Sequence, residues 1–221
     1  MVKIYYTDIH RLCEPSVLEQ LCELVNEQRR SKILRCKNKE DKRRSLAAGL
    51  LLRFAMEKQG LDYEKACFSV GENGKPYLLG QDDFFFSLSH SGDMVVCAVF
   101  EEEIGADVES MHRVEKICKD ASKIEGILNR IATQAEMEWF HKLPETEKTK
   151  GFLRLWPGKE SFGKRNGQGI SQNLRNTTVL DEAQYLFLQL EEEYYLSVCA
   201  NKIKETGHLL VTIDIAKEYL K

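Results

Sequence analysis

The first hundred residues combine two kinds of hydrophobic repeat. Val2–Tyr6 is a short apolar, β-branched run, which predicts a strand. Apolar residues then recur twice at helical spacing, and the second stretch, Ser45–Lys58, predicts a well-buried helix. Phe84–Leu88 and Met94–Phe100 follow as two strands joined by a Ser89–Asp93 turn. This half therefore predicts helices followed by an antiparallel strand pair.

The rest of the chain repeats this order. After an acidic bend, Ile104–Glu109 predicts a third strand. A T-x-x-E capping box at Thr133 marks the start of a helix. Glu147–Arg165 then carries its large apolar residues on one helical face. Ala183–Leu190 and Tyr194–Ala200 predict a second hairpin.

These two series of elements point to an α+β protein. We expect a pseudo-two-fold arrangement of two similar α+β halves, residues 1–103 and 104–221, each with a small antiparallel sheet packed against helices. A chain of 221 residues suits two intimately packed halves of about 100 residues better than one compact core. The strands Met94–Phe100 and Tyr195–Ala200 also share a Val-Cys-Ala sequence, which is weak support for an internal repeat.

Composition narrows the class of protein. The net charge is only −3, so the chain as a whole has no attraction for nucleic acid or for a membrane surface. The seven cysteines are scattered without a C-x-x-C pair, which favours reduced thiols in a cytoplasmic protein. The apolar runs are too short to cross a bilayer, and the first residues lack a signal-peptide core. We expect a cytoplasmic protein that binds neither nucleic acid nor membrane, and a monomer because its paired halves are already fused.

Asp107 and Glu109 are the first candidates for chemistry. They stand two residues apart on a predicted strand, so both carboxylates project from one face. Mg²⁺ typically takes one or two carboxylates and completes its shell with water and substrate phosphates. The alternative is an exposed strand edge with solvated charges, because a D-x-E pair alone has low specificity.

Glu160 and Lys164 lie four residues apart on the predicted helix and therefore share a face. An ordinary surface ion pair is one interpretation. In the other, Glu160 reaches the metal or accepts a proton while Lys164 neutralises a phosphate. The neighbouring Trp156 and Phe162 indicate that this helix is buried, which favours the second interpretation.

Three further features suit an anionic ligand. His90 lies in a predicted turn rich in serine hydroxyls, and Lys75 lies in a Gly-Lys-Pro turn. Nine basic residues stand between Arg29 and Arg44 against two acidic ones. A solvated helical face accounts for most of them, and a few would hold a phosphate. The chain has neither a Walker loop nor a G-x-G-x-x-G sequence, which excludes nucleotide binding by those loops, and the lack of a G-x-S-x-G elbow makes a serine hydrolase a poor fit.

Taken in order, these motifs resemble those of a known family. They are Gly74-Lys75-Pro76-Tyr77, Phe86-Ser87-Leu88-Ser89-His90-Ser91-Gly92, Ile104-Gly105-Ala106-Asp107-Val108-Glu109 and Trp156-x-x-Lys159-Glu160-Ser161-Phe162-x-Lys164. The set is similar to that of the 4'-phosphopantetheinyl transferases, in particular the single-chain, two-halves type that activates surfactin synthetase. The resemblance covers nearly the whole chain. It implies transfer of the phosphopantetheine arm of coenzyme A to a serine of an apo acyl or peptidyl carrier protein, with release of 3',5'-ADP.

The resemblance also implies roles for individual residues. Mg²⁺ and the pyrophosphate of coenzyme A would be held by Asp107, Glu109 and Glu160, with Lys164 on the pyrophosphate. The nucleotide and its phosphates would be bound by Lys75, Ser89 and His90, and the 3'-phosphate by Arg29, Lys32 and Arg44. The attacking hydroxyl would arrive on the carrier protein, which explains why the sequence offers no good internal nucleophile. Glu160 is then the candidate general base and Lys164 the group that stabilises charge on the phosphoryl oxygens.

One departure from the family pattern is Pro157-Gly158, just ahead of Glu160. A proline inside a helix removes a backbone hydrogen bond and costs about 3 kcal/mol or more, so we expect either a helix broken at Pro157 or a displaced Glu160. A second hypothesis follows, a coenzyme A-binding protein with weak or no transferase activity. A third is a Mg²⁺-dependent hydrolase of nucleotide pyrophosphates, which would cleave coenzyme A without any carrier.

Overall fold

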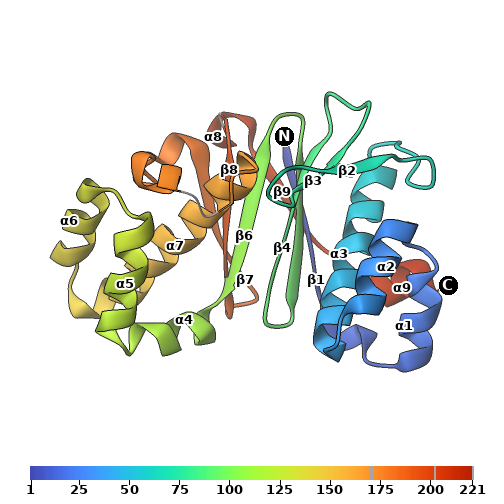
Figure 1. Ribbon diagram of the computed structural model, residues 1–221, viewed down its shortest axis with the longest axis horizontal. Coiled ribbons are helices and arrows are strands. Elements are labelled where there is room, and N and C mark those ends of the chain that lie inside the picture. The colour runs from blue at the N-terminus through green and yellow to red at the C-terminus, as the bar shows by residue number, and fades with distance from the viewer. Residues whose placement is uncertain (170–171, 202, 221) are drawn as a thin grey trace.

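Two sheets lie at the centre and share an apolar core, and helices cover the outer side of each (Figure 1). The computed structural model describes residues 1–169, 172–201 and 203–220. The helices on one side come mainly from the first sixty residues, and those on the other side lie between residues 111 and 165. Small sheets packed against helices confirm the expected α+β class.

The elements follow the predicted order along the chain. The strands are β1 (Val2–Asp8), β2 (Phe68–Val70), β3 (Pro76–Leu78), β4 (Phe85–Ser91), β5 (Met94–Phe100), β6 (Ile104–Ser110), β7 (Tyr185–Leu190), β8 (Tyr194–Ala200) and β9 (His208–Thr212). The helices are α1 (Pro15–Cys22), α2 (Glu27–Arg35), α3 (Lys39–Glu57), α4 (Met111–Cys118), α5 (Ala121–Ile131), α6 (Gln134–Lys142), α7 (Lys148–Arg165), α8 (Ile203–Thr206) and α9 (Ile215–Tyr219). Short 3-10 helices lie at Ile9–Leu12, Glu145–Glu147, Gln172–Asn176 and Glu182–Gln184. In the described part of the chain, no helix is both long and apolar enough to span a membrane.

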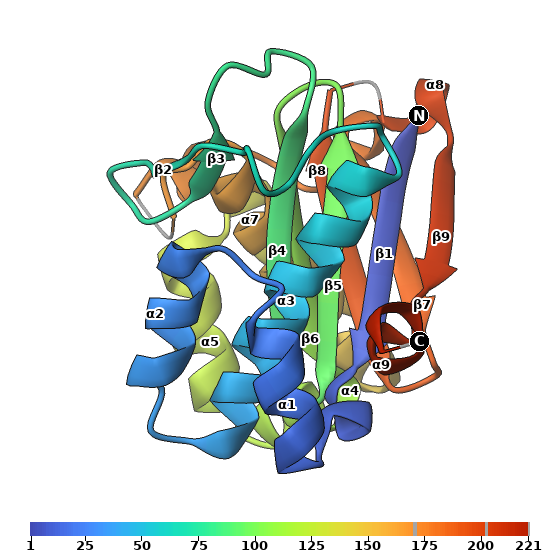
Figure 2. The same cartoon turned by 90° about the vertical axis from the view of Figure 1, so that its right-hand side faces the viewer.

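The last strand returns to the first sheet. That sheet has the order β4-β5-β1-β9, a second large sheet has the order β6-β8-β7, and β2 and β3 form a separate two-stranded sheet. All neighbours are antiparallel except β9, which pairs in parallel with β1. Helix α9 packs against α1 and α3. Residues 208–220 therefore lie with the first half (Figure 2), whereas the predicted boundary grouped all of 104–221 together.

Strand β4 is longer than the sequence pattern indicated. The predicted turn began at Ser89, but β4 continues to Ser91, and Gly92 alone of the turn residues takes a positive φ, +54°. His90 is therefore a strand residue opposite Val95, not a turn residue. Strand alternation sends the side chain of His90 to the face opposite that of Ser89 and Ser91.

Serine hydroxyls join the two sheets. Strands β4 and β6 run side by side but belong to different sheets. Three serines of β4, which we call the serine seam, bridge them: Ser87, Ser89 and Ser91 accept hydrogen bonds from the backbone N–H groups of Ala106 at 2.9 Å, Val108 at 3.1 Å and Ser110 at 3.0 Å, respectively. The register advances by two residues on both strands, so β4 and β6 run parallel. The serine hydroxyls thus accept the hydrogen bonds of β6 N–H groups, a role that backbone carbonyls of a neighbouring strand play within a continuous sheet.

Helix α7 lies directly on β6 because residue 105 is a glycine. A Cβ atom at Gly105 would stand 1.9 Å from the carbonyl oxygen of Ser161 and 2.4 Å from the backbone nitrogen of Arg165. A larger residue would force the helix away from the strand. Gly105 therefore sets the spacing between the helix that carries Glu160 and the strand that carries Asp107.

Of the two outcomes expected at Pro157, a broken helix or a displaced Glu160, the break is wrong, because α7 continues through the proline from Lys148 to Arg165. Phe152, Leu153 and Leu155 are at most 1% exposed, so the preceding turns are anchored in the core. This tertiary packing holds the helix across the missing backbone hydrogen bond.

Candidate active site

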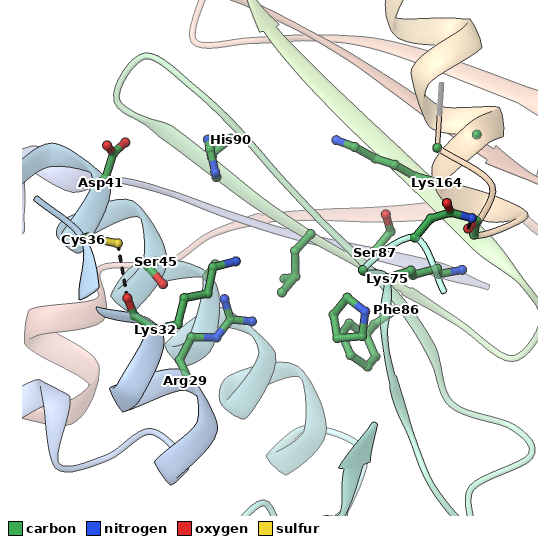
Figure 3. Close-up of a pocket in the computed structure, with 18 residues that line it drawn as sticks. Arg29, Lys32, Cys36, Asp41, Ser45, Lys75, Phe86, Ser87, His90 and Lys164 are labelled. Atoms are coloured by element: carbon green, nitrogen blue, oxygen red, sulfur yellow. Dashed lines mark hydrogen bonds between the residues drawn. The ribbon is translucent and has the colours of Figure 1, made fainter. Parts of the chain in front are cut away.

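A cavity of about 480 Å³ opens between the two halves. Its walls come from α2, α3, the turn between β2 and β3, strand β4 and the C-terminal end of α7 (Figure 3). It therefore brings together segments that lie more than 130 residues apart, from Arg29 to Lys164.

Two cations from α2 lie at one end of this cavity. Arg29 and Lys32 point into it (Figure 3), and neither the guanidinium of Arg29 nor the ammonium of Lys32 makes a hydrogen bond or ion pair with another residue described in the structure. Burial lowers the pKa of Arg29, and burial together with the adjacent Arg29 charge lowers the pKa of Lys32. Gly49 provides the room, since a Cβ there would stand 3.1 Å from Cγ of Arg29. Two partly buried cations side by side require an anion.

Ser45 adds a hydroxyl to the cationic end, and sequence reasoning missed it. Its residue is 7% exposed, and its Oγ has no hydrogen-bond partner within the described chain. It lines the same cavity as Arg29 and Lys32. Nothing in the sequence indicated this role, because Ser45 is the first residue of an apolar helical stretch, where a serine is readily interpreted as a surface residue. An orphaned buried hydroxyl here fits a phosphate oxygen.

Arg44 lies apart from this pair of cations. Its guanidinium donates to Asp41 Oδ1 at 2.6 Å and to the Gly92 carbonyl oxygen at 2.8 Å. It therefore ties α3 to the β4–β5 turn. Arg44 is not among the residues that line the cavity, in contrast to Arg29 and Lys32.

His90 lines the cavity from β4. Partial burial of the ring lowers its pKa, and the nearby positive charges of Arg44, Lys164 and Lys32 lower it further. The imidazole is therefore held neutral near pH 7, and a bound anion would raise its pKa again.

The ammonium of Lys75 is directed away from Arg29 and Lys32 (Figure 3). It donates to Glu103 Oε2 at 2.8 Å, to the Ile104 carbonyl at 3.2 Å and to the Arg165 carbonyl at 2.8 Å. Lys75 thus ties the β2–β3 turn to the junction of the halves and to the C-terminal end of α7, while its stem lines the cavity.

Asp107 and Glu109 lie on one face of β6, as the two-residue spacing predicted. Asp107 Oδ1 accepts from Lys164 Nζ at 2.7 Å and from Ser89 Oγ at 3.1 Å. The intervening Val108 is buried in the opposite, apolar face. Asp107 Oδ2 is buried without a partner in the described chain. Burial raises the pKa of Asp107, an effect that Lys164 opposes.

Glu109 is held through both of its carboxylate oxygens. Trp156 Nε1 donates to Oε1 at 2.8 Å, and Ser91 Oγ donates to Oε2 at 3.0 Å. Arg113 approaches Oε2 at 3.5 Å from an exposed position. Trp156 and Ser91 therefore orient the Glu109 carboxylate. The sequence motifs contain both residues but did not indicate this role.

Glu160 faces the same carboxylates from α7. Burial raises the pKa of Glu160 to about 7, with the charges of Asp107 and Glu109 adding to the rise and Lys164 opposing it. The side chain makes no hydrogen bond with any described residue. Lys164 bonds Ser89 Oγ at 2.8 Å as well as Asp107, so it does not form the surface ion pair with Glu160 that was the alternative interpretation of this spacing.

These carboxylates fit a divalent cation in their chemistry. Three acidic side chains repel one another, two have raised pKa values, and one buried oxygen of Asp107 lacks a donor. Over residues 1–169, 172–201 and 203–220, no three His, Cys, Asp or Glu side chains are close enough to ligate one ion directly. Oxygen ligands supplemented by water and substrate phosphate are what Mg²⁺ prefers.

Lys159, between these groups in sequence, has a different task. Its ammonium pairs with Glu136 Oε2 at 2.7 Å, and both side chains are at most 1% exposed. It also donates to the carbonyls of Leu174 and Thr177, while Glu136 Oε1 accepts from the Val179 N–H at 2.7 Å. The pair therefore anchors the segment after α7. The predicted capping box of Thr133 and Glu136 is also confirmed.

Comparison with known proteins identifies relatives of this chain. Residues 13–102 match the model of the N-terminal region of 4'-phosphopantetheinyl transferases, and residues 103–213 match that of the 4'-phosphopantetheinyl transferase superfamily. The chain is 32% identical to a 4'-phosphopantetheinyl transferase of Bacillus subtilis over 90% of its own length and 92% of that protein. It is 31% identical to the 4'-phosphopantetheinyl transferase Sfp of Bacillus subtilis strain 168, over 80% and 76% of the two chains. It is also 31% identical to HetI of Nostoc sp., over 51% and 46%.

Proposed function

The chain belongs to the 4'-phosphopantetheinyl transferase superfamily, and we propose that it moves the phosphopantetheine arm of coenzyme A onto a serine of an apo acyl or peptidyl carrier protein. The products would be the loaded carrier and 3',5'-ADP, with Mg²⁺ as the metal. We also propose that it acts as a cytoplasmic monomer.

One observation carries this proposal. A single cavity has at one end two cations and a hydroxyl that find no partner among the described residues, and at the other end Lys164, beside Asp107 and Glu160. Coenzyme A carries anions at two separated places, a 3'-phosphate and a pyrophosphate. Arg29, Lys32 and Ser45 suit the 3'-phosphate, and Lys164 suits the pyrophosphate.

Each residue then has a defined part in the transfer. The serine hydroxyl of the carrier attacks the phosphorus that bears the pantetheine arm, and the bond to the ADP oxygen breaks. Glu160 accepts the serine proton, a task for which a pKa of about 7 suits it. Lys164 turns from Asp107 to the pyrophosphate and neutralises the charge of the departing ADP. Asp107, Glu109 and Glu160, together with water and the substrate phosphates, would hold Mg²⁺, which would further stabilise the phosphate charge.

The remaining residues bind rather than react. His90 lines the cavity and would gain a proton beside a phosphate. Ser89 lies on the opposite face of β4 and would act through Asp107 and Lys164, which its hydroxyl contacts. Lys75 contributes its stem and turn backbone to the nucleotide site, since its ammonium is bonded to Glu103 and the Arg165 carbonyl. Arg44 contributes through longer-range charge unless it exchanges Asp41 for the phosphate.

A mass-spectrometric assay tests the proposal. Purified protein is incubated with coenzyme A, Mg²⁺ and a panel of apo-carriers from fatty-acid, polyketide and peptide synthesis. A gain of one phosphopantetheine arm on at least one carrier supports transfer. Coenzyme A that binds without any carrier gaining mass would favour the binding-protein alternative, and cleavage of coenzyme A without a carrier would favour the hydrolase. The unbroken helix α7 argues against the binding-protein alternative, because Pro157 leaves Glu160 facing Asp107 and Glu109.

A further inference from the structure

Two members of the serine seam also touch the acidic residues. Ser89 donates to Asp107 Oδ1 at 3.1 Å, and Ser91 donates to Glu109 Oε2 at 3.0 Å. Ser87 bonds the Ala106 N–H but contacts no carboxylate among the described residues. The seam therefore couples the junction of the two sheets to the acidic site at two of its three positions.

The seam fixes the direction in which Ser91 donates. A serine hydroxyl has one proton to donate and lone pairs with which to accept. The Ser110 N–H occupies the accepting side at 3.0 Å, so the proton is left for Glu109. Ser91 is 3% exposed and Glu109 is 7% exposed, so water does not compete freely for either group.

The carboxylate of Glu109 is consequently hydrogen-bonded to side chains of two elements, β4 and α7. Ser91 on β4 holds Oε2, and Trp156 on α7 holds Oε1 at 2.8 Å. With Trp156 on Oε1, Ser91 on Oε2 and a longer contact from the exposed Arg113 to Oε2 at 3.5 Å, the plane of the carboxylate is set before any cation arrives. The remaining lone pairs are left in a defined direction for a ligand.

We propose that Ser91 is a positioning residue of the Mg²⁺ site, acting through Glu109 and itself held in place by the seam. This proposal rests on the function proposed above. The same Ser91 hydroxyl links β4 to β6 and orients Glu109. The Mg²⁺ site is therefore complete only when the two sheets are correctly assembled. Loss of an outer partner of a metal ligand typically weakens metal affinity about 10- to 100-fold.

Ser87 provides a matched control. Ser87→Ala and Ser91→Ala each remove one hydroxyl from the seam and leave one backbone N–H without its acceptor, a buried one at Ala106 and a partly buried one at Ser110, respectively. We expect both variants to show a similar fall in melting temperature. Ser91→Ala alone loses the contact with Glu109. Ser89 is unsuitable for this comparison because its Oγ also bonds Lys164.

The decisive measurement is calorimetric titration of Mg²⁺ into protein saturated with coenzyme A. We expect Ser91→Ala to bind Mg²⁺ about tenfold more weakly than the wild type, or weaker still, and Ser87→Ala to show a smaller loss of Mg²⁺ affinity. Equal Mg²⁺ affinities in the two variants would overturn the proposal, and so would a wild-type protein that takes up no Mg²⁺.

A second pair of variants covers the case in which Ser91→Ala does not fold. Ser91→Thr and Ser91→Val have nearly the same shape and differ in the hydroxyl. We expect Thr to retain tighter Mg²⁺ binding than Val, and equal binding would contradict the proposal. Failure of the transferase function is separate, because it would appear as wild-type protein that loads no carrier at any Mg²⁺ concentration.

Discussion

Glu160 illustrates how burial and like charge act on a single side chain. Its pKa is raised to about 7 by burial first and by Asp107 and Glu109 next. A carboxyl group with this pKa exchanges its proton near neutral pH, whereas an ordinary Glu is ionised above about 4.3. The same environment that suits a general base therefore makes the ionised, metal-free site unfavourable.

The metal-free protein should lose stability as the pH rises. Because the folded-state pKa of Glu160 lies above the unfolded value, the stabilisation by its protonated form is fully present below about pH 4.3 and is lost as the pH rises through about 7. We expect the melting temperature without metal to fall between pH 5 and 8, and to fall less in Glu160→Gln. Thermal unfolding in chelator-treated buffers measures this difference. Parallel pH profiles for the two proteins would show that Glu160 does not titrate as described.

The buried pair of Lys159 and Glu136 makes a second residue-level prediction. Lys159→Met leaves the Glu136 carboxylate buried beside the Val179 N–H without its cation, which should cost about 3–5 kcal/mol. The double variant Lys159→Met, Glu136→Gln removes both charges and should recover part of that loss. Urea unfolding gives the free energies. A Lys159→Met protein as stable as the wild type would contradict the buried ion pair.

At the level of elements, the register of α7 against β6 governs the site. Gly105 permits backbone contact between them, so that Glu160 and Lys164 on the helix meet Asp107 on the strand. The sequence predicted both elements and the two-residue alternation of β6. It did not predict the contact, since the role of Gly105 depends on a helix more than forty residues later.

Gly105→Ala should therefore impair catalysis through the helix. The new methyl would overlap the Ser161 carbonyl, which should cost about 1–3 kcal/mol in stability and displace Glu160 and Lys164. We expect kcat to fall about 100-fold, in line with a misplacement near 1 Å. Carrier-loading kinetics and urea unfolding measure the two effects.

Gly126→Ala is the matched control for Gly105→Ala. Gly126 lies in α5, and a Cβ there meets nothing within 4 Å among the described residues. Alanine should add about 0.5–1 kcal/mol of stability and leave kcat unchanged. If Gly105→Ala has the same kcat as Gly126→Ala, the contact between α7 and β6 does not control the geometry of the site.

For the whole molecule, local patterns predicted the elements but not the way in which the halves meet. Hairpin β7–β8 and the capping box at Thr133 follow from short-range signals and are confirmed. The return of β9 to β1 and the serine seam depend on contacts between distant segments, which periodicity does not encode. Pro157 misled for the same reason, because core packing around α7 outweighs a local helix-breaking preference. Among the site residues, the charged side chains could be predicted from their chemistry and spacing. The roles of Ser45 and Ser91 could not, because they depend on neighbours that only the folded cavity and serine seam bring together.

The charge distribution across the cavity predicts which part of the substrate is recognised where. Replacing Arg29 and Lys32 together by Ala should weaken coenzyme A binding at least tenfold, since each charged hydrogen bond contributes about 1.5–3 kcal/mol. Dephospho-coenzyme A, which lacks the 3'-phosphate, should lose much less affinity. Calorimetric titration with both ligands measures the difference. An equal loss for both would place the 3'-phosphate elsewhere.

The arrangement of the bound substrate is the central claim, and a crystal structure with coenzyme A and Mn²⁺ in place of Mg²⁺ tests it most directly. We predict the 3'-phosphate on Arg29, Lys32 and Ser45, the pyrophosphate on Lys164, and the anomalous signal of the metal beside Asp107. A diphosphate bound outside this cavity, or a metal remote from Asp107, would contradict the account.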